Sequence, residues 1–311
     1  MIAPFTPSPE VADALAASAP VVALESTIIT HGLPAPRNIE VAREAEATIR
    51  GLGATPATIA VIDGTLHVGL TDEELTRLAA AENVWKLSRA DLAVAMATGA
   101  TGATTVAATM IAARLAGVEV FATGGIGGVH RGAETDFDIS ADLTELAETP
   151  VTVVCAGAKA ILDLPKTLEA LETRGVPVIG YRTDDLPAFW SRSSGLAAPL
   201  RLDDPTAIAA AHAARRALGV PGGQLVANPI PTEVEIPRAE IAPLIDAALA
   251  AASAAGVSGK AVTPYLLAEI LRRTSGRSLE ANIGLYLSNC RLAAEIAAAV
   301  CLIAQEGGRS P

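Results

Sequence analysis

The sequence predicts an α/β protein whose C-terminal third is helical. Two observations predict this class. Short runs rich in Val, Ile and Ala alternate with Ala-, Leu- and Glu-rich stretches of helical period. In addition, 50% of the 311 residues are hydrophobic and only 3% are aromatic. A chain of this length and composition buries a large aliphatic core.

The predicted elements follow the apolar runs in chain order. Each strand is a short run bounded by turn residues, and each helix has apolar positions spaced three and four residues apart. The expected strands are Val21–Leu24, Thr58–Val61, Val118–Ala122, Val151–Cys155 and Val176–Tyr181. The expected helices are Asn38–Leu52, Asp72–Ala81, Thr104–Ala116, Ala158–Leu162 with a continuation after Pro165, Ala207–Leu218, Arg238–Ala255 and Leu285–Gln305.

The domain organisation is expected to be simple. Two Pro-, Gly- and Ser-rich stretches, Ala188–Pro199 and Pro221–Pro237, are short enough to be ordered loops over one domain. We therefore expect a single catalytic domain over residues 1–311, with a short extension or helix at 1–19 and a flexible tail at 306–311.

Composition also argues against several functions and locations. The net charge of −11 and the scarcity of aromatics disfavour a nucleic-acid binder. The N-terminus lacks the basic region of a secretory signal, and the uncharged window Val94–Ala113 holds too many Thr and Gly residues for a lipid-facing helix. Three irregularly spaced cysteines match no disulfide framework. We expect a cytoplasmic protein without a membrane segment.

The first candidate site residue is Glu25, which ends an apolar strand. Ligands of open α/β sheets bind beyond the carboxyl ends of the strands, so residues at these positions carry the most information. A poorly solvated carboxyl favours its neutral form and suits acid–base chemistry. The alternative is that Glu25 pairs with an arginine or caps a turn.

Two glycine-containing segments favour an anion site. Lys86 precedes the Thr-Gly loop Thr98–Thr105, which leads into a helix whose free N–H groups suit a phosphate. The loop lacks the Gly-Lys-Ser/Thr ending of a P-loop, and the later run Gly124–Gly128 does not match GxGxxG. His130, two residues beyond that run, adds a further candidate. A capped helix and a tight structural turn are the alternatives.

The segment Glu134–Asp142 is densely acidic in a chain with few charges. Hard oxygen ligands of this kind suit Mg²⁺ or Mn²⁺. An EF-hand is excluded because Ala141 and Ala147 replace the glycine and the bidentate glutamate that its loop requires. A solvated loop that caps the following helix is the alternative.

Lys159 follows the strand Val151–Cys155 and is flanked by Ala and Gly. Desolvation of an amine favours its neutral, nucleophilic form, which imine chemistry requires. The alternative is a side chain that reaches solvent from a short helix. Arg192 and Asn289 complete the polar residues that stand out.

Together these segments resemble the pseudouridine-5′-phosphate glycosidase family, which shares the fold of indigoidine synthase A-like proteins. The resemblance runs from about Pro20 to the C-terminal helix, and its most specific blocks are 23–32, 102–107, 123–143, 155–167 and 189–195. It implies a three-layer α/β/α fold with a central, mostly parallel or mixed sheet, a homotrimer and one Mn²⁺ ion per subunit. The implied reaction is reversible cleavage of the C–C bond of pseudouridine 5′-phosphate to uracil and ribose 5-phosphate.

The resemblance also implies residue roles. Lys159 would form an imine with C1′ of the ring-opened ribose, Glu25 would move the proton at C5 of uracil, and Asp138 would be the protein ligand of the metal. Where the family has Ser or Thr followed by Met, this chain has Asp136-Phe137, so Asp136 could add a second carboxylate. The substrate-contacting positions implied by the resemblance are Lys86, Val106, Ser140, Ala141 and Asp142. To these we add Thr105 and His130 as candidates for binding the phosphate, and Asn289 from the polar residues noted above.

Two other functions compete with this hypothesis. One is a related C- or N-glycosidic lyase acting on another phosphoribosyl heterocycle, as in pigment pathways. The other is a non-catalytic subunit that binds a metabolite. The presence of both Glu25 and Lys159 argues against the binding subunit, because a binder needs no imine-forming lysine.

Overall fold

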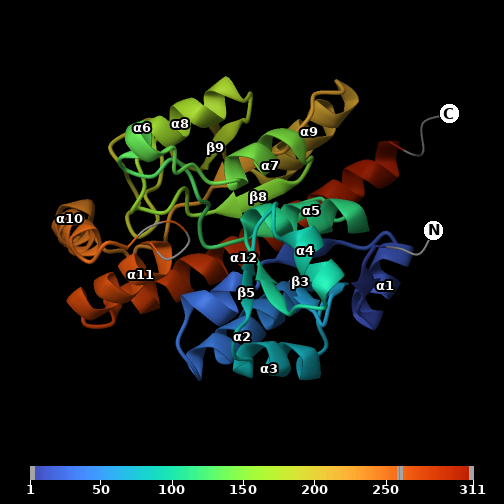
Figure 1. The fold of residues 1–311 in the computed structure, drawn as a ribbon. Helices are drawn as coiled ribbons and strands as arrows, with labels where there is room; N and C mark the ends of the chain where they lie inside the picture. Colours follow the sequence, from blue (N-terminus) through green and yellow to red (C-terminus); the bar gives the residue numbers. More distant parts are fainter. Residues whose placement is uncertain (1–3, 258, 260–261, 308–311) are drawn as a thin grey trace.

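The structure is a computed structural model that describes residues 4–257, 259 and 262–307. Eleven strands form one connected sheet flanked by helices on both faces (Figure 1). The strands are β1 (Thr6–Pro7), β2 (Val21–Leu24), β3 (Thr55–Ile62), β4 (Thr65–Val68), β5 (Trp85–Leu87), β6 (Gly102–Thr104), β7 (Val120–Ala122), β8 (Thr152–Cys155), β9 (Val178–Tyr181), β10 (Leu200–Leu202) and β11 (Gln224–Ala227).

The helices alternate with these strands through most of the chain. The described α-helices are α1 (Pro9–Ala16), α2 (Arg37–Gly51), α3 (Asp72–Ala80), α4 (Leu92–Thr98), α5 (Val106–Ala116), α6 (Ala133–Asp136), α7 (Asp142–Glu148), α8 (Leu164–Thr173), α9 (Pro205–Ala217), α10 (Arg238–Ala254), α11 (Val262–Arg273) and α12 (Arg277–Gly307). One π-helix, η1 (Ile28–Gly32), follows β2.

The sheet is mixed but mostly parallel, as predicted. Its main path runs β1-β4-β3-β2-β7-β8-β11-β9-β10, and every pairing from β3 to β10 along this path is parallel. The antiparallel pairings join β3 to β4 and to β6. Parallel order brings the carboxyl ends of β2, β7 and β8 to one edge, which is where the candidate residues follow these strands.

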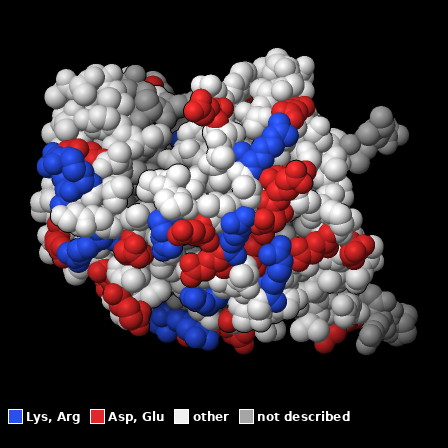
Figure 2. Space-filling view, turned by 90° about the horizontal axis from the view of Figure 1, so that it is seen from below, with Lys and Arg blue, Asp and Glu red and all other residues white. Residues whose placement is uncertain are grey.

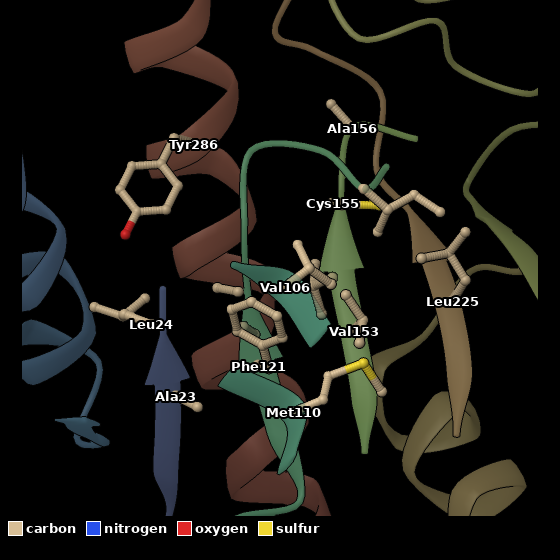
Figure 3. Packing of buried hydrophobic residues seen from close by; sticks show 14 of the residues in the cluster. Ala23, Leu24, Val106, Met110, Phe121, Val153, Cys155, Ala156, Leu225 and Tyr286 are labelled. Atoms are coloured by element: carbon tan, nitrogen blue, oxygen red, sulfur yellow. The ribbon is translucent and has the colours of Figure 1, made fainter. Parts of the chain in front are cut away.

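Helices pack on the two faces of the sheet as the three-layer prediction requires. On one face α12 packs against β2, β7 and β8 and between α2 and α9, and on the other α5 packs against β2, β3 and β7. Figure 3 shows Tyr286 of α12 beside Leu24, and Met110 of α5 beside Phe121 and Val153. These side chains are almost fully buried, so the aliphatic core predicted from composition lies between the sheet and both helix layers.

By length and composition, α12 could cross a membrane, but half of its most apolar window is buried inside the molecule. Its contacts with three strands identify it as a core helix. The window Val94–Ala113, considered above, divides into α4, β6 and the buried helix α5. The cytoplasmic location and the absence of a membrane partner stay predictions.

Several predicted elements need correction. Ala158–Leu162 is not a helix, because Ala158 forms a parallel bridge with Ile126 and a turn follows before α8. The stretch Pro221–Pro237 is not only a loop, since it contains β11 in the middle of the sheet. The helix expected from Thr104 starts at Val106, and the one expected from Leu285 starts at Arg277.

The predicted ends of the chain are only partly described. Residues 4–19 of the predicted N-terminal extension contain β1 and α1, so it includes a helix. Of the predicted tail at 306–311, residues 308–311 lie outside the described residues. In Figure 1, α1 and the C-terminal end of α12 lie on the same side of the molecule.

Charged side chains of opposite sign lie next to one another on the surface. Figure 2 shows Lys and Arg interspersed with Asp and Glu on the face that it presents. Pairs such as Arg43–Asp72 and Arg50–Glu10 are exposed. No broad basic patch is visible in this view, which agrees with the net charge of −11.

Candidate active site

A cavity of about 390 Å³ lies at the carboxyl ends of β2, β7 and β8. The residues predicted from the sequence that line it are Glu25, Lys86, Thr105, Val106, His130, Asp138, Ser140, Ala141, Asp142 and Lys159. These residues come from segments spread over more than a hundred positions of the chain. The structure therefore brings ten of the predicted site residues to one cavity.

Glu25 follows β2 directly and is only 7% exposed. Its Oε1 accepts a hydrogen bond of 2.5 Å from the hydroxyl of Thr123, and its Oε2 accepts one from the hydroxyl of Thr27. A hydroxyl can either donate or accept, so this pair can hold Glu25 in both its charged and its neutral form. No arginine pairs with Glu25 among the described residues, so the structure does not support that alternative.

Lys159 lies on the extension of β8 beyond Gly157. Its N–H donates to the carbonyl of Ile126 (3.1 Å), and the Ala158–Ile126 bridge holds the backbone on its N-terminal side. Gly157 has φ +87°, and a Cβ there would meet the carbonyl oxygen of Pro187 at 2.5 Å. The Lys159 amine forms no hydrogen bond or ion pair with any of the described residues. This amine is half-buried in the cavity wall and available for reaction.

The N-terminus of α5 forms the next part of the wall. Thr105 is its N-cap residue, but its hydroxyl is buried and has no hydrogen-bond partner in the described part of the chain. An unpaired buried hydroxyl is costly unless a ligand satisfies it. With the adjacent N–H groups of α5 and the Lys86 side chain, Thr105 forms a set of donors suited to a phosphate.

Asp142 plays a supporting role at this position. Its Oδ1 accepts from the N–H of Ala107 (2.9 Å) and its Oδ2 from the N–H of Gly127 (2.7 Å). Because both carboxylate oxygens are committed to backbone, Asp142 joins α5 to the glycine-rich loop. Its neighbour Ser140 accepts from the N–H of Asp142 (3.2 Å).

The glycines after β7 are required by close packing. A Cβ on Gly125 would lie 2.7 Å from the ring of Phe189, and one on Gly127 would lie 2.3 Å from the hydroxyl of Ser140. Both glycines line the cavity. The run therefore lets the backbone approach the ligand space and its neighbours closely, without forming a dinucleotide motif.

Asp138 is the candidate metal ligand. Its carboxylate is 37% exposed, lines the cavity and lies 3.9 Å from Nδ1 of His130. Asp136 does not line the cavity, and its Oδ1 accepts from the N–H of Asp138 (2.9 Å). Among the described residues, no group of three His, Cys, Asp or Glu side chains could together hold an ion. The donors present fit a cation bound by one carboxylate and completed by water.

His130 is mostly buried between Asp138 and Lys159. Burial lowers its pKa, the nearby charge of Asp138 acts in the opposite direction, and Lys159 lowers the pKa further. The net effect is a pKa below the usual value, so the ring is neutral at neutral pH. A neutral His130 can offer a hydrogen bond to a ligand but no positive charge.

Two residues in the polar set lie away from the cavity. Asn289 on α12 is fully buried, accepts from Asn228 (3.0 Å) and donates to the carbonyl of Thr123 (2.8 Å). It supports the segment that carries Thr123 and does not face the ligand space. Arg192 donates to the carbonyl of Ile230 (2.7 Å) and so stabilises its own loop.

The structure adds side chains that follow no strand. Phe189 is the aromatic residue in the lining and has φ +60°, a strained conformation held by its N–H bond to Ala156. Asn282 on α12 accepts at Oδ1 from the indole N–H of Trp190 (2.6 Å). Because an indole can only donate, this bond fixes the amide and leaves the Asn282 NH₂ group free for the cavity.

The chain matches known proteins over most of its length. The family model described as "Indigoidine synthase A like protein" matches residues 10–299. A pseudouridine-5′-phosphate glycosidase of Paracoccus denitrificans is 68% identical over 94% of this chain and 97% of its own. One of Roseobacter denitrificans is 64% identical over 98% of this chain and 99% of its own.

Two solved structures share the fold. The prealnumycin C-glycosynthase AlnA in complex with ribulose 5-phosphate has a TM-score of 0.90 and 43% identity, covering 97% of this chain and 98% of that one. An indigoidine synthase A-like protein from Thermotoga maritima has a TM-score of 0.84 and 37% identity, covering 91% of this chain and 93% of that one. These similarities confirm the α/β fold with its long C-terminal helix.

Proposed function

The chain belongs to the indigoidine synthase A-like family and, within it, to the pseudouridine-5′-phosphate glycosidases, and from this premise we propose that it reversibly cleaves pseudouridine 5′-phosphate to uracil and ribose 5-phosphate. One observation carries the mechanism. The unpaired amine of Lys159 and the hydroxyl-held carboxyl of Glu25 line the same cavity. A C–C bond has no leaving oxygen to protonate, so the paired-carboxylate chemistry of ordinary glycosidases does not apply.

In the direction of synthesis, the Lys159 amine condenses with the C1 aldehyde of open-chain ribose 5-phosphate and releases water. C5 of uracil then attacks the imine carbon, and Glu25 accepts the proton that C5 loses. The 4-hydroxyl of the sugar displaces the Lys159 amine and closes the ring. Uracil and ribose 5-phosphate thus give pseudouridine 5′-phosphate and one water.

Cleavage follows the same steps in reverse. Lys159 replaces the ring oxygen on C1′, and Glu25 donates a proton to C5 of uracil. As the C–C bond breaks, its electron pair goes to C5 while the lone pair of the Lys159 nitrogen forms the imine. Water then hydrolyses the imine and releases ribose 5-phosphate.

The remaining lining residues bind the two ends of the substrate. Lys86, the Thr105 hydroxyl and the N–H of Val106 suit the phosphate, with Ser140 and Ala141 beside them. The NH₂ group of Asn282 suits a carbonyl oxygen of uracil.

We propose that Asp138 holds one hydrated Mn²⁺ ion, which would order water around the base. Assembly as a homotrimer is part of the same proposal. Removal of the metal with a chelator should abolish turnover, and Mn²⁺ should restore it. Full activity in chelator would remove Asp138 from this role.

A second function is favoured by one observation, the 43% identity to a C-glycosynthase solved with a sugar phosphate. In that case the cavity would join a phosphosugar to a different ring. The deciding experiment is to incubate the protein with Mn²⁺, uracil and ribose 5-phosphate and to detect pseudouridine 5′-phosphate. Absence of this product contradicts the proposal, and turnover of another aromatic acceptor would favour the second function.

A further inference from the structure

A second cavity of about 260 Å³ adjoins the first. It lies between the η1 segment and the helices α11 and α12. The two cavities are continuous in their lining, because they share His31, Gly32, Leu33, Pro264, Leu267 and Asn282. The second cavity is therefore an immediate neighbour of the first.

The far wall of the second cavity is largely apolar. Ala268 and Leu271 of α11 face Leu279 of α12, and hydroxyls of Thr30 and Ser278 complete it. Of the described residues in its lining, none is Lys, Arg, Asp or Glu. The proposed phosphate-binding residues of the main cavity are likewise absent from this lining. The second cavity therefore suits a small, neutral, partly polar molecule and disfavours a phosphate.

His31 is the titratable side chain on the shared wall. Burial lowers its pKa, the nearby charge of Lys86 lowers it further, and a hydrogen bond to the carbonyl of Val84 opposes both. Its Nδ1 lies 2.6 Å from the hydroxyl of Thr30. A neutral His31 keeps the junction uncharged.

Asn282 stands at the same junction and lines both cavities. The bond from Trp190 holds its amide in one orientation, and no hydrogen bond joins its Nδ2 to another described residue. Its NH₂ group can thus donate to a carbonyl-bearing ring at the junction. The junction combines a fixed donor with apolar neighbours, as recognition of a flat heterocycle requires.

The proposed chemistry creates a need for such a space. While the sugar phosphate remains attached to Lys159, neutral uracil must leave or enter without displacing it. We propose that the second cavity is the passage and holding site for uracil, separate from the space that the sugar phosphate occupies. This inference rests on the proposed function and concerns the order of events in the same site.

A larger side chain placed in the second cavity tests the inference. Ala268 is exposed and lines only the second of the two cavities, so Ala268→Trp narrows it without changing the main one. In the synthesis assay kcat/KM for uracil should fall about tenfold, equivalent to ~1.4 kcal/mol. The KM for ribose 5-phosphate and the borohydride-trapped adduct on Lys159 should not change.

The matched control is Ala210→Trp, at an exposed position of α9 that lines neither cavity. Equal kcat/KM for uracil in the two variants would overturn the inference. If Ala268→Trp does not fold, Ala268→Leu places a smaller side chain in the second cavity. An unchanged kcat/KM for uracil in that variant would again overturn the inference. Failure of the proposed function would be distinguishable from failure of this inference, since the unmodified protein would then form neither pseudouridine 5′-phosphate nor the Lys159 adduct.

Discussion

The two edges of the sheet each have a cavity, and the cavities differ in whether their polar groups are hydrogen-bonded within the protein. The cavity at the carboxyl edge has a volume of about 390 Å³, and the one near the amino ends of β2 and β7 about 450 Å³. At the carboxyl edge the Lys159 amine and the Thr105 hydroxyl have no hydrogen-bond partner among the described residues. At the amino edge the lining is mostly Ala, Val and Leu, and Glu119 is already paired.

The amino edge even contains the spacing of a catalytic triad. The hydroxyl of Thr152 lies 3.1 Å from Nδ1 of His212, and Nε2 of His212 lies 3.2 Å from Glu119. Thr152 and His212 are buried, however, and neither lines the cavity there. Gln224 donates to the same hydroxyl of Thr152 (3.2 Å). At the carboxyl edge unpaired donors line the cavity, whereas at the amino edge the three groups with triad-like spacing are bonded to one another.

The largest expected effect is at Lys159. Lys159→Ala should abolish the release of uracil, because the proposed imine forms on the Lys159 amine and Lys86, which also lines the cavity, is assigned to the phosphate. Lys166→Ala is the matched control, since that nearby lysine is exposed and paired with Glu134 (2.8 Å) and Asp163 (3.0 Å). A substantial rate in Lys159→Ala, or loss of activity in both variants, would contradict the difference drawn between committed and free groups.

Glu25→Gln should have the second largest effect. Loss of a general acid–base group typically lowers kcat by about 10²–10⁴-fold. The adduct between Lys159 and ribose 5-phosphate should still form, because the glutamine keeps the shape of the side chain and the amine is untouched. Measurement of kcat together with borohydride trapping separates the two roles. Loss of trapping along with turnover would mean that Glu25 acts at the imine step instead.

A smaller effect is expected at Arg89, which joins the segment that carries Lys86 to α7, beside the proposed phosphate site. Its guanidinium donates to Glu145 (2.7 Å) and Glu148 (2.6 Å) on α7, whereas Lys86 lies three residues before it. Arg89→Met should raise the KM for ribose 5-phosphate by roughly tenfold with little change in kcat. The reason is that Lys86 would lose its support, since a charge-assisted hydrogen bond contributes about 1.5–3 kcal/mol. Arg89→Lys should recover part of the loss.

Arg43→Met is the control for Arg89, because it breaks an exposed pair with Asp72 (2.7 Å) and neither of these residues lines the cavity. Both variants can lose some stability, but only Arg89→Met should change KM. Equal KM values for ribose 5-phosphate in the two variants would show that the hydrogen bonds from Arg89 to α7 do not position Lys86.

The smallest effect on catalysis is expected at the amino edge. Burial alone would raise the pKa of Glu119, but its hydrogen bond from His212 and the guanidinium of Arg216 outweigh burial and hold the pKa below its ordinary value of 4.5. A carboxyl with a lowered pKa stabilises the fold above its unfolded pKa, and this stabilisation is lost as the pH falls through the folded pKa.

Glu119→Gln should therefore leave kcat and KM unchanged. It should lower the free energy of unfolding at pH 7 by about 1 kcal/mol, the size of a typical net hydrogen bond. Thermal melts from pH 7 to pH 3 should show a weaker loss of stability below about pH 4.5 than in the unmodified protein. A change in kcat would mean that the amino edge has a catalytic role.

Much of the fold followed from the sequence because the parallel strands are short apolar runs. The failures have local causes. β11 is a four-residue strand just after Gly222-Gly223, so its surroundings indicate a loop, and only its pairing with β8 and β9 makes it a strand. Ala158–Leu162 has helix-forming residues, but the bridge to Ile126 extends the backbone instead. In both cases tertiary pairing overrides local propensity.

The site was predictable where its residues follow strands. The places of Glu25 and Lys159 in the cavity lining follow from this pattern, because parallel strands place their carboxyl ends together. Asn282 and Phe189 were missed because they lie on a helix and a loop that reach the cavity only through long-range packing. The bond from Trp190 to Asn282 spans 92 positions and has no local signal in the sequence. Asn289 was predicted to contact the substrate, but it is buried away from the cavity. The sequence gives no local signal for this, since its burial depends on how α12 is rotated against β7.

In the mechanism that we propose, the free amine of Lys159 is the group that reacts with the sugar. The most direct test is to add borohydride to the protein with ribose 5-phosphate and to map the modified residue by mass spectrometry. We predict one reduced ribose 5-phosphate adduct, on Lys159. An absent adduct, or one on Lys86 or Lys166, would contradict the claim.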